Sequence, residues 1–301
     1  GIWISVFLSI SAYCNAGFDI LGFLKPDSSL TLFVNDPLVC VTIALLIIIG
    51  GIGFIVITDI HSWGSKKFKK VENHPHLALH TIVALETTVA LLLVGTVLFF
   101  TFEYNNTLAN MNFFQKLHAS FFQSATARTA GFASIDVGRQ LDITKMLTIV
   151  LMFIGASPSS TGGGIKTTTF VVIISTVLSV LRGKNETVLK KRRVDRTVVY
   201  RSLSIVVLSV LVVIITTVVI AIAESSHNVS ALDALFESVS AFGTVGLTAG
   251  ITQGLTVVSK IALIITMFIG RVGPISLLLA LTMHHNSRLE TILPEGKIIV
   301  G

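Results

Sequence analysis

The short tract CNAGF at residues 14–18 recurs as RTAGF at residues 128–132 and as GTVGL at residues 243–247. The glycines at the fourth position of the three copies are separated by nearly equal intervals of 114 and 115 residues. A fixed internal period is the sequence signature of a repeated structural unit. The sequence therefore predicts that one unit has been copied along the chain, with each copy built around a glycine-centred tract.

Each tract follows a run that suits a short helix and precedes a long apolar stretch. The three runs are residues 5–13, 113–127 and 231–242. A helix needs about 20 residues to cross the hydrocarbon core of a bilayer, which is about 30 Å thick. These runs are too short to cross, so we expect them to be re-entrant helices that enter and leave on the same side.

The composition places the chain among integral membrane proteins. Of its 301 residues, 52% are hydrophobic and 13% are charged, and the mean hydropathy is +0.85. Soluble domains carry about 25% charged residues, so a soluble class is excluded. The two cysteines, Cys14 and Cys40, predict neither a disulfide framework nor a metal site.

The distribution of Lys and Arg predicts the orientation in the membrane. We expect five crossings, at residues 37–58, 77–102, 141–181, 202–223 and 256–283. The loop at 182–201 holds eight Lys or Arg and the loop after Thr58 holds four, whereas residues 224–255 hold none. Basic loops stay on the cytoplasmic side. The C-terminus and both basic loops are then cytoplasmic, all three tracts lie outside, and the net charge of +6 requires no nucleic-acid partner.

The repeated tract has the composition of a pore lining. Irregular backbone at membrane depth is tolerated only where protein buries it or where it lines a watery path. A glycine at the turn permits left-handed backbone, so that successive carbonyl oxygens can face one way and replace the water around a cation. The alternative is a small-residue packing turn between helices. Three copies at constant spacing favour the pore.

The 36 residues from Met146 to Leu181 would make one helix of about 54 Å, which exceeds the membrane core. The glycine- and proline-rich segment 155–164 predicts a break that lines a water-filled cavity. A phosphate-binding loop is disfavoured because the Walker pattern needs Gly directly before the Lys, and Ile165 precedes Lys166.

Two arginines need explanation. Arg271 lies inside the last crossing, where a charge faces a cavity or a partner. We expect it to face the pore, with an ion pair to Glu86 as the alternative. We expect Arg128 to be packed behind its tract and tied to a carboxylate such as Glu86 or Glu237.

With these tracts, and with the runs at residues 152–157, 267–274 and 294–296, the chain resembles the Trk/Ktr/HKT superfamily of potassium transporters, and most of all its bacterial Ktr membrane subunits. The resemblance implies an all-α integral membrane protein in which repeated helix–pore helix–filter loop–helix units surround a pseudo-fourfold pore. Residues 1–76 would be the second unit, 77–198 the third and 199–301 the fourth. We expect the first unit and the leading helix of the second to precede residue 1, about 150 residues by the period.

The resemblance also implies site residues. The following residues would form the K+ filter: Cys14, Asn15, Ala16, Gly17, Arg128, Thr129, Ala130, Gly131, Gly243, Thr244, Val245 and Gly246. The following would form an intramembrane gate below it: Gly155, Ala156, Ser157, Pro158, Ser159, Ser160, Thr161, Gly162, Gly163, Gly164, Lys166 and Arg271.

The function implied is K+ uptake across the inner (plasma) membrane by a non-enzymatic pore subunit, with K+ as the transported ion, Na+ as a second candidate ion and no organic cofactor. The implied partners are a second copy in a homodimer, the lipid bilayer and a cytoplasmic nucleotide-binding ring of the KtrA/KtrC type. Two alternatives remain: a proton- or sodium-coupled secondary transporter, for which Glu86 is the candidate carboxylate, and a non-conducting assembly subunit.

Overall fold

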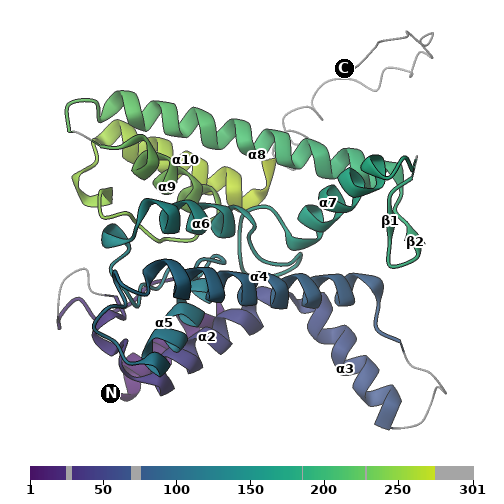
Figure 1. Ribbon diagram of the computed structural model, residues 1–301, viewed down its shortest axis with the longest axis horizontal. Helices are drawn as coiled ribbons and strands as arrows, with labels where there is room; N and C mark the ends of the chain where they lie inside the picture. Colours follow the sequence, from purple (N-terminus) through teal and green to yellow (C-terminus); the bar gives the residue numbers. More distant parts are fainter. Residues whose placement is uncertain (25–28, 69–75, 185, 228, 275–301) are drawn as a thin grey trace.

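The computed structural model describes residues 1–24, 29–68, 76–184, 186–227 and 229–274, and the description below is limited to them. Within these ranges most of the chain is helical (Figure 1). The α-helices and strands are α1 (Ile2–Tyr13), α2 (Pro37–Ile52), α3 (Phe54–Phe68), α4 (Leu79–Glu103), α5 (Phe113–Thr126), α6 (Asp142–Phe153), α7 (Thr167–Leu181), β1 (Val188–Leu189), β2 (Arg192–Arg193), α8 (Arg196–Ala223), α9 (Ala231–Phe242) and α10 (Val257–Val272). Three 3₁₀ turns are η1 (Thr31–Phe33), η2 (Val137–Arg139) and η3 (Thr252–Gly254).

The order of elements repeats along the chain. Each short helix, α1, α5 or α9, is followed by a glycine tract, a 3₁₀ turn and the start of another helix, α2, α6 or α10. The three predicted short helices are thereby confirmed. In Figure 1, α4 and α8 run along the long axis, with α5 and α9 near one end and the β1–β2 hairpin and the tip of α3 at the other. The limits of the three units, at residues 76 and 198, stay a prediction.

Two helices are long and apolar enough to cross a membrane by themselves, α4 with 25 residues and α8 with 28. They correspond to the predicted crossings at 77–102 and 202–223. The prediction of one helix over 37–58 is wrong, because α2 and α3 meet at an angle of 91°. Gly53, between them, has a left-handed φ of 98°, and a Cβ there would lie 2.4 Å from the carbonyl oxygen of Pro158. The break therefore makes room for the backbone of another segment.

The crossing predicted over 141–181 divides into α6 and α7 on either side of residues 155–164, which confirms the break. The last crossing differs from the prediction of one helix through Met283. The helix α10 ends at Val272, and Gly273 follows with φ 90°. Residues 275–301, including the tail and the run at 294–296, lie outside the described residues, as do Lys69 and Lys70 of the first basic loop.

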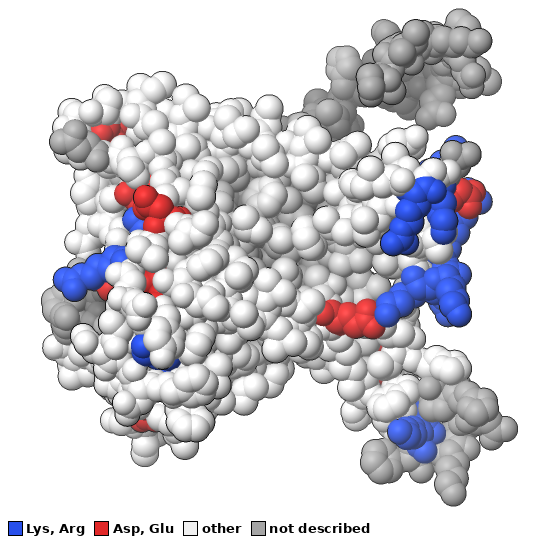
Figure 2. Space-filling view, in the orientation of Figure 1, with Lys and Arg blue, Asp and Glu red and all other residues white. Residues whose placement is uncertain are grey.

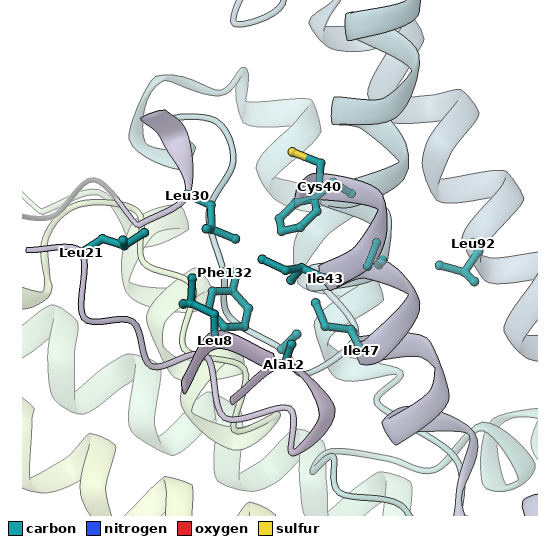
Figure 3. Close-up of a cluster of buried hydrophobic side chains, with 13 residues drawn as sticks. Leu8, Ala12, Leu21, Leu30, Cys40, Ile43, Ile47, Leu92 and Phe132 are labelled. Carbon is teal, nitrogen blue, oxygen red and sulfur yellow. The ribbon is translucent and has the colours of Figure 1, made fainter. Parts of the chain in front are cut away.

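A buried apolar cluster joins the first tract region to the second (Figure 3). Phe132, which directly follows the second tract, is fully buried among side chains that include Leu8 and Ala12 of α1 and Ile43 and Ile47 of α2. Burying a large side chain of this kind contributes about 1.5–3 kcal/mol. The position of the second tract is therefore fixed by helices that lie more than 80 residues earlier in the chain.

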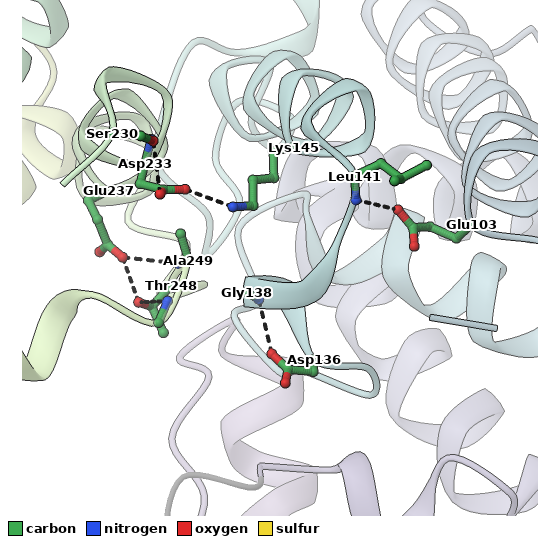
Figure 4. A network of polar contacts seen from close by, with 11 residues as sticks. Glu103, Asp136, Gly138, Leu141, Lys145, Ser230, Asp233, Glu237, Thr248 and Ala249 are labelled. Atoms are coloured by element: carbon green, nitrogen blue, oxygen red, sulfur yellow. Dashed lines mark hydrogen bonds and ion pairs between the residues drawn. The ribbon is translucent and has the colours of Figure 1, made fainter. Parts of the chain in front are cut away.

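A buried carboxylate at the end of α4 fixes the start of α6. The side chain of Glu103 is fully buried, and its Oε1 accepts a hydrogen bond of 3.0 Å from the backbone N–H of Leu141, which precedes α6 (Figure 4). Its Oε2 accepts hydrogen bonds from Asn106 at 2.8 Å and from the hydroxyl of Thr107 at 2.7 Å. A helix start leaves unpaired N–H groups, and an anion there is favourable.

The same arrangement recurs at the end of α8. Glu224, which is 1% exposed, accepts hydrogen bonds from the backbone N–H of Thr256 at 2.8 Å and from the hydroxyl of Ser259 at 2.6 Å, at the start of α10. The hydrogen bonds from Ser259 and Thr256 lower the pKa of Glu224 to about 2. Because the folded pKa is depressed, this stabilisation is complete above the ordinary value of 4.5 and is lost as the pH falls through about 2.

We expect Glu103→Gln to destabilise the protein, because an amide NH₂ would face groups that are themselves donors. Leaving such buried groups unsatisfied costs about 1–3 kcal/mol. Thermal unfolding of the detergent-solubilised protein measures the loss. The matched control is Glu86→Gln on the same helix, where the side chain is 55% exposed and the change should have little effect. Equal melting temperatures for both variants would contradict the role of Glu103.

Candidate functional site

The three glycine tracts meet in the structure. Gly17, Gly131 and Gly246 have left-handed φ values of 71°, 85° and 94°. A Cβ on Gly17 would lie 2.4 Å from the carbonyl oxygen of Ala130, and one on Gly131 would lie 2.1 Å from that of Val245. These positions exclude any side chain, because the backbone of the next tract already occupies the space. The second tract thus contacts both the first and the third, while the placement of the three glycines around one pore stays a prediction.

A second left-handed residue precedes each glycine by two positions. Asn15, Thr129 and Thr244 have φ values of 49°, 76° and 48°. Left-handed backbone outside glycine costs about 1–3 kcal/mol and persists only where the surroundings enforce it. Within each tract, two left-handed residues enclose one that is not left-handed, which is Ala16, Ala130 or Val245. The three tracts therefore share one backbone pattern, which their surroundings hold in place.

In each short helix, one hydroxyl group donates a hydrogen bond to the carbonyl oxygen of the residue that follows the tract glycine. Ser11 donates to the carbonyl oxygen of Phe18 at 2.7 Å, Thr126 to that of Phe132 at 2.7 Å, and Ser240 to that of Leu247 at 2.6 Å. Sequence reasoning missed these residues. The signal was a hydroxyl residue five or six positions before each repeated glycine, and it could have been found by aligning the copies.

For the cation uptake that the family resemblance implies, we expect Ser240→Ala to lower the rate by about tenfold or more while leaving the protein in the membrane. The Ser240 hydroxyl also accepts from the N–H of Gly246 at 3.2 Å, so its loss leaves two tract groups without a partner. Unsatisfied buried groups cost about 1–3 kcal/mol each. The control is Ser238→Ala, because the Ser238 hydroxyl donates only to Ala234 within its own helix. The rate of Rb+ uptake is measured for both variants as a function of Rb+ concentration. Equal rates for Ser240→Ala and Ser238→Ala would contradict this role of Ser240.

Polar contacts hold α9 and the third tract in place (Figure 4). Lys145 of α6 forms an ion pair of 2.8 Å with Asp233 of α9. Glu237, also on α9, accepts hydrogen bonds from Thr248 and from the N–H of Ala249, which follow the third tract. The carboxylate of Glu237 is 4% exposed and thus belongs to the scaffold of the tract.

Residues 161–163 of the glycine-rich segment 155–164 lie directly against the tracts. A Cβ on Gly162 would lie 2.1 Å from the Thr129 hydroxyl oxygen, and one on Gly163 would lie 2.4 Å from that of Thr244. The hydroxyl of Thr161 lies 3.2 Å from the Asn15 side chain. Three consecutive residues of the segment therefore face the first left-handed residue of the three tracts.

The same segment is fastened to the corner between α2 and α3. The N–H of Ser157 donates to Gly51 O at 3.0 Å, and the N–H of Phe54 donates to Ser159 O at 2.9 Å. At the base of the segment, Ile154 and Ile165 form a parallel bridge. The remaining glycines pack closely, since a Cβ on Gly155 would lie 2.1 Å from the carbonyl oxygen of Gly163.

Two cations bind carbonyl groups of this segment. Arg271 of α10 donates to the carbonyl oxygen of Thr161, and Lys166 donates to that of Gly162 at 2.6 Å. Arg271 also lines a hollow of about 730 Å³ together with Asn15 and Gly246. The alternative of an Arg271–Glu86 ion pair is wrong, because Glu86 pairs with Lys190 at 2.8 Å.

The prediction of a carboxylate partner for Arg128 is also wrong. Its guanidinium is buried behind the second tract and donates weakly to the carbonyl and hydroxyl of Thr88, at 3.5 and 3.4 Å. Glu237 is engaged by the third tract, and Glu86 by Lys190. Sequence spacing could not distinguish a cation held by carbonyl dipoles from one held by an ion pair.

Within the described ranges, no group of three or more His, Cys, Asp or Glu side chains could hold a metal ion. The chemistry available at the junction of the tracts is therefore that of backbone carbonyls, hydroxyls and the two cations of the 155–164 segment.

The profile of the TrkH family, described as cation transport protein, matches residues 1–291. The chain belongs to the TrkH family. Members of this family transport ions and are not enzymes, as the sequence predicted. One solved structure with a similar fold is the crystal structure of the potassium transporter TrkH from Vibrio parahaemolyticus. It matches with a TM-score of 0.69 and 16% identity, over 90% of this chain and 56% of that chain.

Three relatives in the TrkH family align with this chain over its whole length. The Ktr system potassium uptake protein B of Bacillus subtilis is 39% identical, and that of Vibrio alginolyticus is 40% identical. The potassium/sodium uptake protein NtpJ of Enterococcus hirae is 38% identical. The alignments cover 64%, 63% and 64% of these relatives, so the chain spans less than two thirds of their length.

Proposed function

We propose that this protein takes up K+ through a pore whose narrow part is lined by the three glycine tracts. The observation that carries the proposal is the mutual contact of Gly17, Gly131 and Gly246 through left-handed backbone. Rings of carbonyl oxygens can replace the water shell of a K+ ion. The names of the relatives, which are potassium uptake proteins, support K+ as the ion. The name of NtpJ supports Na+ as a second transported ion.

The segment 155–164 serves as a gate in this proposal. Thr161, Gly162 and Gly163 occupy the space directly inside the tracts, which is where an ion leaving them would pass. Arg271 adds a positive charge to the hollow beside them. The arrangement represents a closed pore, and opening requires the segment to withdraw from Thr129 and Thr244.

Proton coupling is disfavoured by the position of Glu86. A coupling carboxylate should lie buried on the transport path, because its protonation must depend on the path being occupied. The Glu86 side chain is 55% exposed and pairs with Lys190. Passive flow of the cation down its electrochemical gradient needs no such group.

The protein works in the inner (plasma) membrane as a multi-pass subunit with a cytoplasmic C-terminus. Figure 2 supports this orientation, because Lys and Arg predominate at the end that carries the β1–β2 hairpin, whereas at the other end they are mixed with Asp and Glu. The word "system" in the names of the Ktr relatives supports further components. We assign to this chain a homodimeric state and a cytoplasmic nucleotide-binding ring of the KtrA/KtrC type.

Uptake measurements test this function. The protein, expressed from its complete gene in bacteria that lack K+ transporters, should restore growth at low K+ and take up Rb+ with saturation. The purified protein in proteoliposomes should conduct Rb+ without an imposed pH gradient. Absence of flux in both settings would support a non-conducting assembly subunit, and flux that requires a proton gradient would support the coupled transporter.

A further inference from the structure

A small pocket opens at the end of the molecule away from the glycine tracts, where α7 ends and α8 begins. Its volume is about 250 Å³, and the β1–β2 hairpin forms its third side. Cationic, apolar and other polar side chains line it, and Glu186 is among the polar ones. The cations are Lys184, Arg193 and Arg196, and the apolar wall includes Val180, Val199 and Tyr200.

The pocket has an excess of positive charge. The segment 182–201 holds eight Lys or Arg against Glu186 and Asp195. Arg193 pairs with Glu186 at 3.0 Å, and Asp195 caps the start of α8 through the N–H of Thr197. Among the described residues, Lys184 and Arg196 have no acidic partner. In Figure 2 the basic side chains form a group at this end of the molecule.

The pocket lies at the depth of lipid headgroups. The 28 residues of α8 measure about 42 Å, and the bilayer core is about 30 Å thick. The uncharged part of α8 begins at Ser202, so Arg196 and Tyr200 project beyond the core. Val180 and Tyr200 are each 67% exposed, and they form an apolar wall beside the cations. Aromatic residues at this depth are typical of the membrane interface.

We propose that this pocket binds an anionic phospholipid. Lys184, Arg193 and Arg196 hold the phosphate, and the upper part of an acyl chain lies along Val180, Val199 and Tyr200. Arg193 can keep its ion pair with Glu186, because a guanidinium has five N–H donors. An acidic soluble protein would satisfy the cations but would leave the apolar wall exposed. The combination of both surfaces at headgroup depth therefore favours a lipid.

The binding test uses the purified full-length protein in detergent, titrated with phosphatidylglycerol and, separately, with phosphatidylcholine, with bound lipid counted by native mass spectrometry. We expect phosphatidylglycerol to bind at least tenfold more tightly than phosphatidylcholine. The triple variant Lys184→Gln/Arg193→Gln/Arg196→Gln should lose at least tenfold of this affinity.

The matched control removes the same charge from the same loop outside the pocket: Lys190→Gln/Lys191→Gln/Arg192→Gln. This control should bind phosphatidylglycerol within about threefold of the unmodified protein. If both triple variants lost the same affinity for phosphatidylglycerol, general surface charge would explain the binding, and the proposed site would be wrong. Unchanged binding in the pocket variant would overturn it as well.

Two further measurements separate the lipid from other ligands. Glycerophosphoglycerol, which has the headgroup without acyl chains, should fail to displace the lipid at equal concentration, and Tyr200→Ser should weaken lipid binding. Displacement by the free headgroup would assign the pocket to a soluble phosphate and overturn the proposal. Retained lipid binding with loss of a co-purifying cytoplasmic protein would assign it to a protein partner instead. Gel filtration confirms that each variant is folded.

Discussion

Replacing Gly131 with alanine should abolish K+ uptake, lowering the rate by at least a hundredfold. The added Cβ would lie 2.1 Å from the carbonyl oxygen of Val245, so the second and third tracts could not keep their contact. The φ of 85° adds a backbone penalty of about 1–2 kcal/mol. Movement of one tract away from the other would change the spacing of the carbonyls that face the ion.

The control for this experiment is Gly250→Ala. Gly250 has a similar φ of 94°, but no atom lies within 4 Å of the position that a Cβ would take. The pair thus separates backbone strain from loss of the close contact. Rb+ uptake at matched protein amounts in the membrane gives the comparison. Normal transport by the Gly131 variant, or equal loss in both, would refute the assignment of the tract.

Replacing Arg271 with glutamine should raise K+ uptake by about tenfold. The substitution removes the hydrogen bond to the Thr161 carbonyl and the positive charge in the hollow beside Asn15 and Gly246. A hydrogen bond from a charged group contributes about 1.5–3 kcal/mol, and 1.4 kcal/mol changes an equilibrium constant tenfold. The 155–164 segment should therefore spend more time away from the tracts.

Two variants sharpen the Arg271 experiment. Lys260→Gln removes an exposed charge from the same helix, where Lys260 contacts only the Gln253 carbonyl, and it should leave uptake unchanged. Arg271→Lys keeps the charge but has a shorter side chain. If the charge and the hydrogen bond to Thr161 both matter, its uptake rate should lie between those of Arg271→Gln and the unmodified protein. Initial Rb+ uptake at equal expression is the measurement. An unchanged rate for Arg271→Gln would exclude this residue from the gate.

The features visible in the sequence were those with a local cause. The repeated glycine, the short amphipathic helices and the glycine-rich interruption at 155–164 each follow from residues adjacent in the chain. The right-angle corner at Gly53 was not predictable in this way, because single glycines are common in membrane helices. The corner depends on residues more than 100 positions later. The carbonyl of Pro158 occupies the space beside Gly53, and the carbonyl of Ser159 accepts the hydrogen bond from the Phe54 N–H.

The partners of the charged residues could not be predicted from the sequence either. Arg128 was expected to pair with a carboxylate such as Glu86 or Glu237, yet each of the three has different neighbours. Glu86 faces outward to Lys190, while Glu237 binds the loop after the third tract. A one-dimensional pattern places a charge at a membrane depth, but it does not give the direction in which the side chain points.

The segment inside the tracts is tethered at both ends by the bridge between Ile154 and Ile165. In the proposed gate it would act as a blocker that cannot diffuse away, and each return to the closed position would be a unimolecular event. A few hydrogen bonds hold it: those of Ser157 and Phe54 contribute about 1 kcal/mol each, and that of Arg271 about 1.5–3 kcal/mol. About 5.5 kcal/mol of differential affinity converts a population of 1:99 into 99:1. One bound effector can therefore supply the whole free energy of the switch.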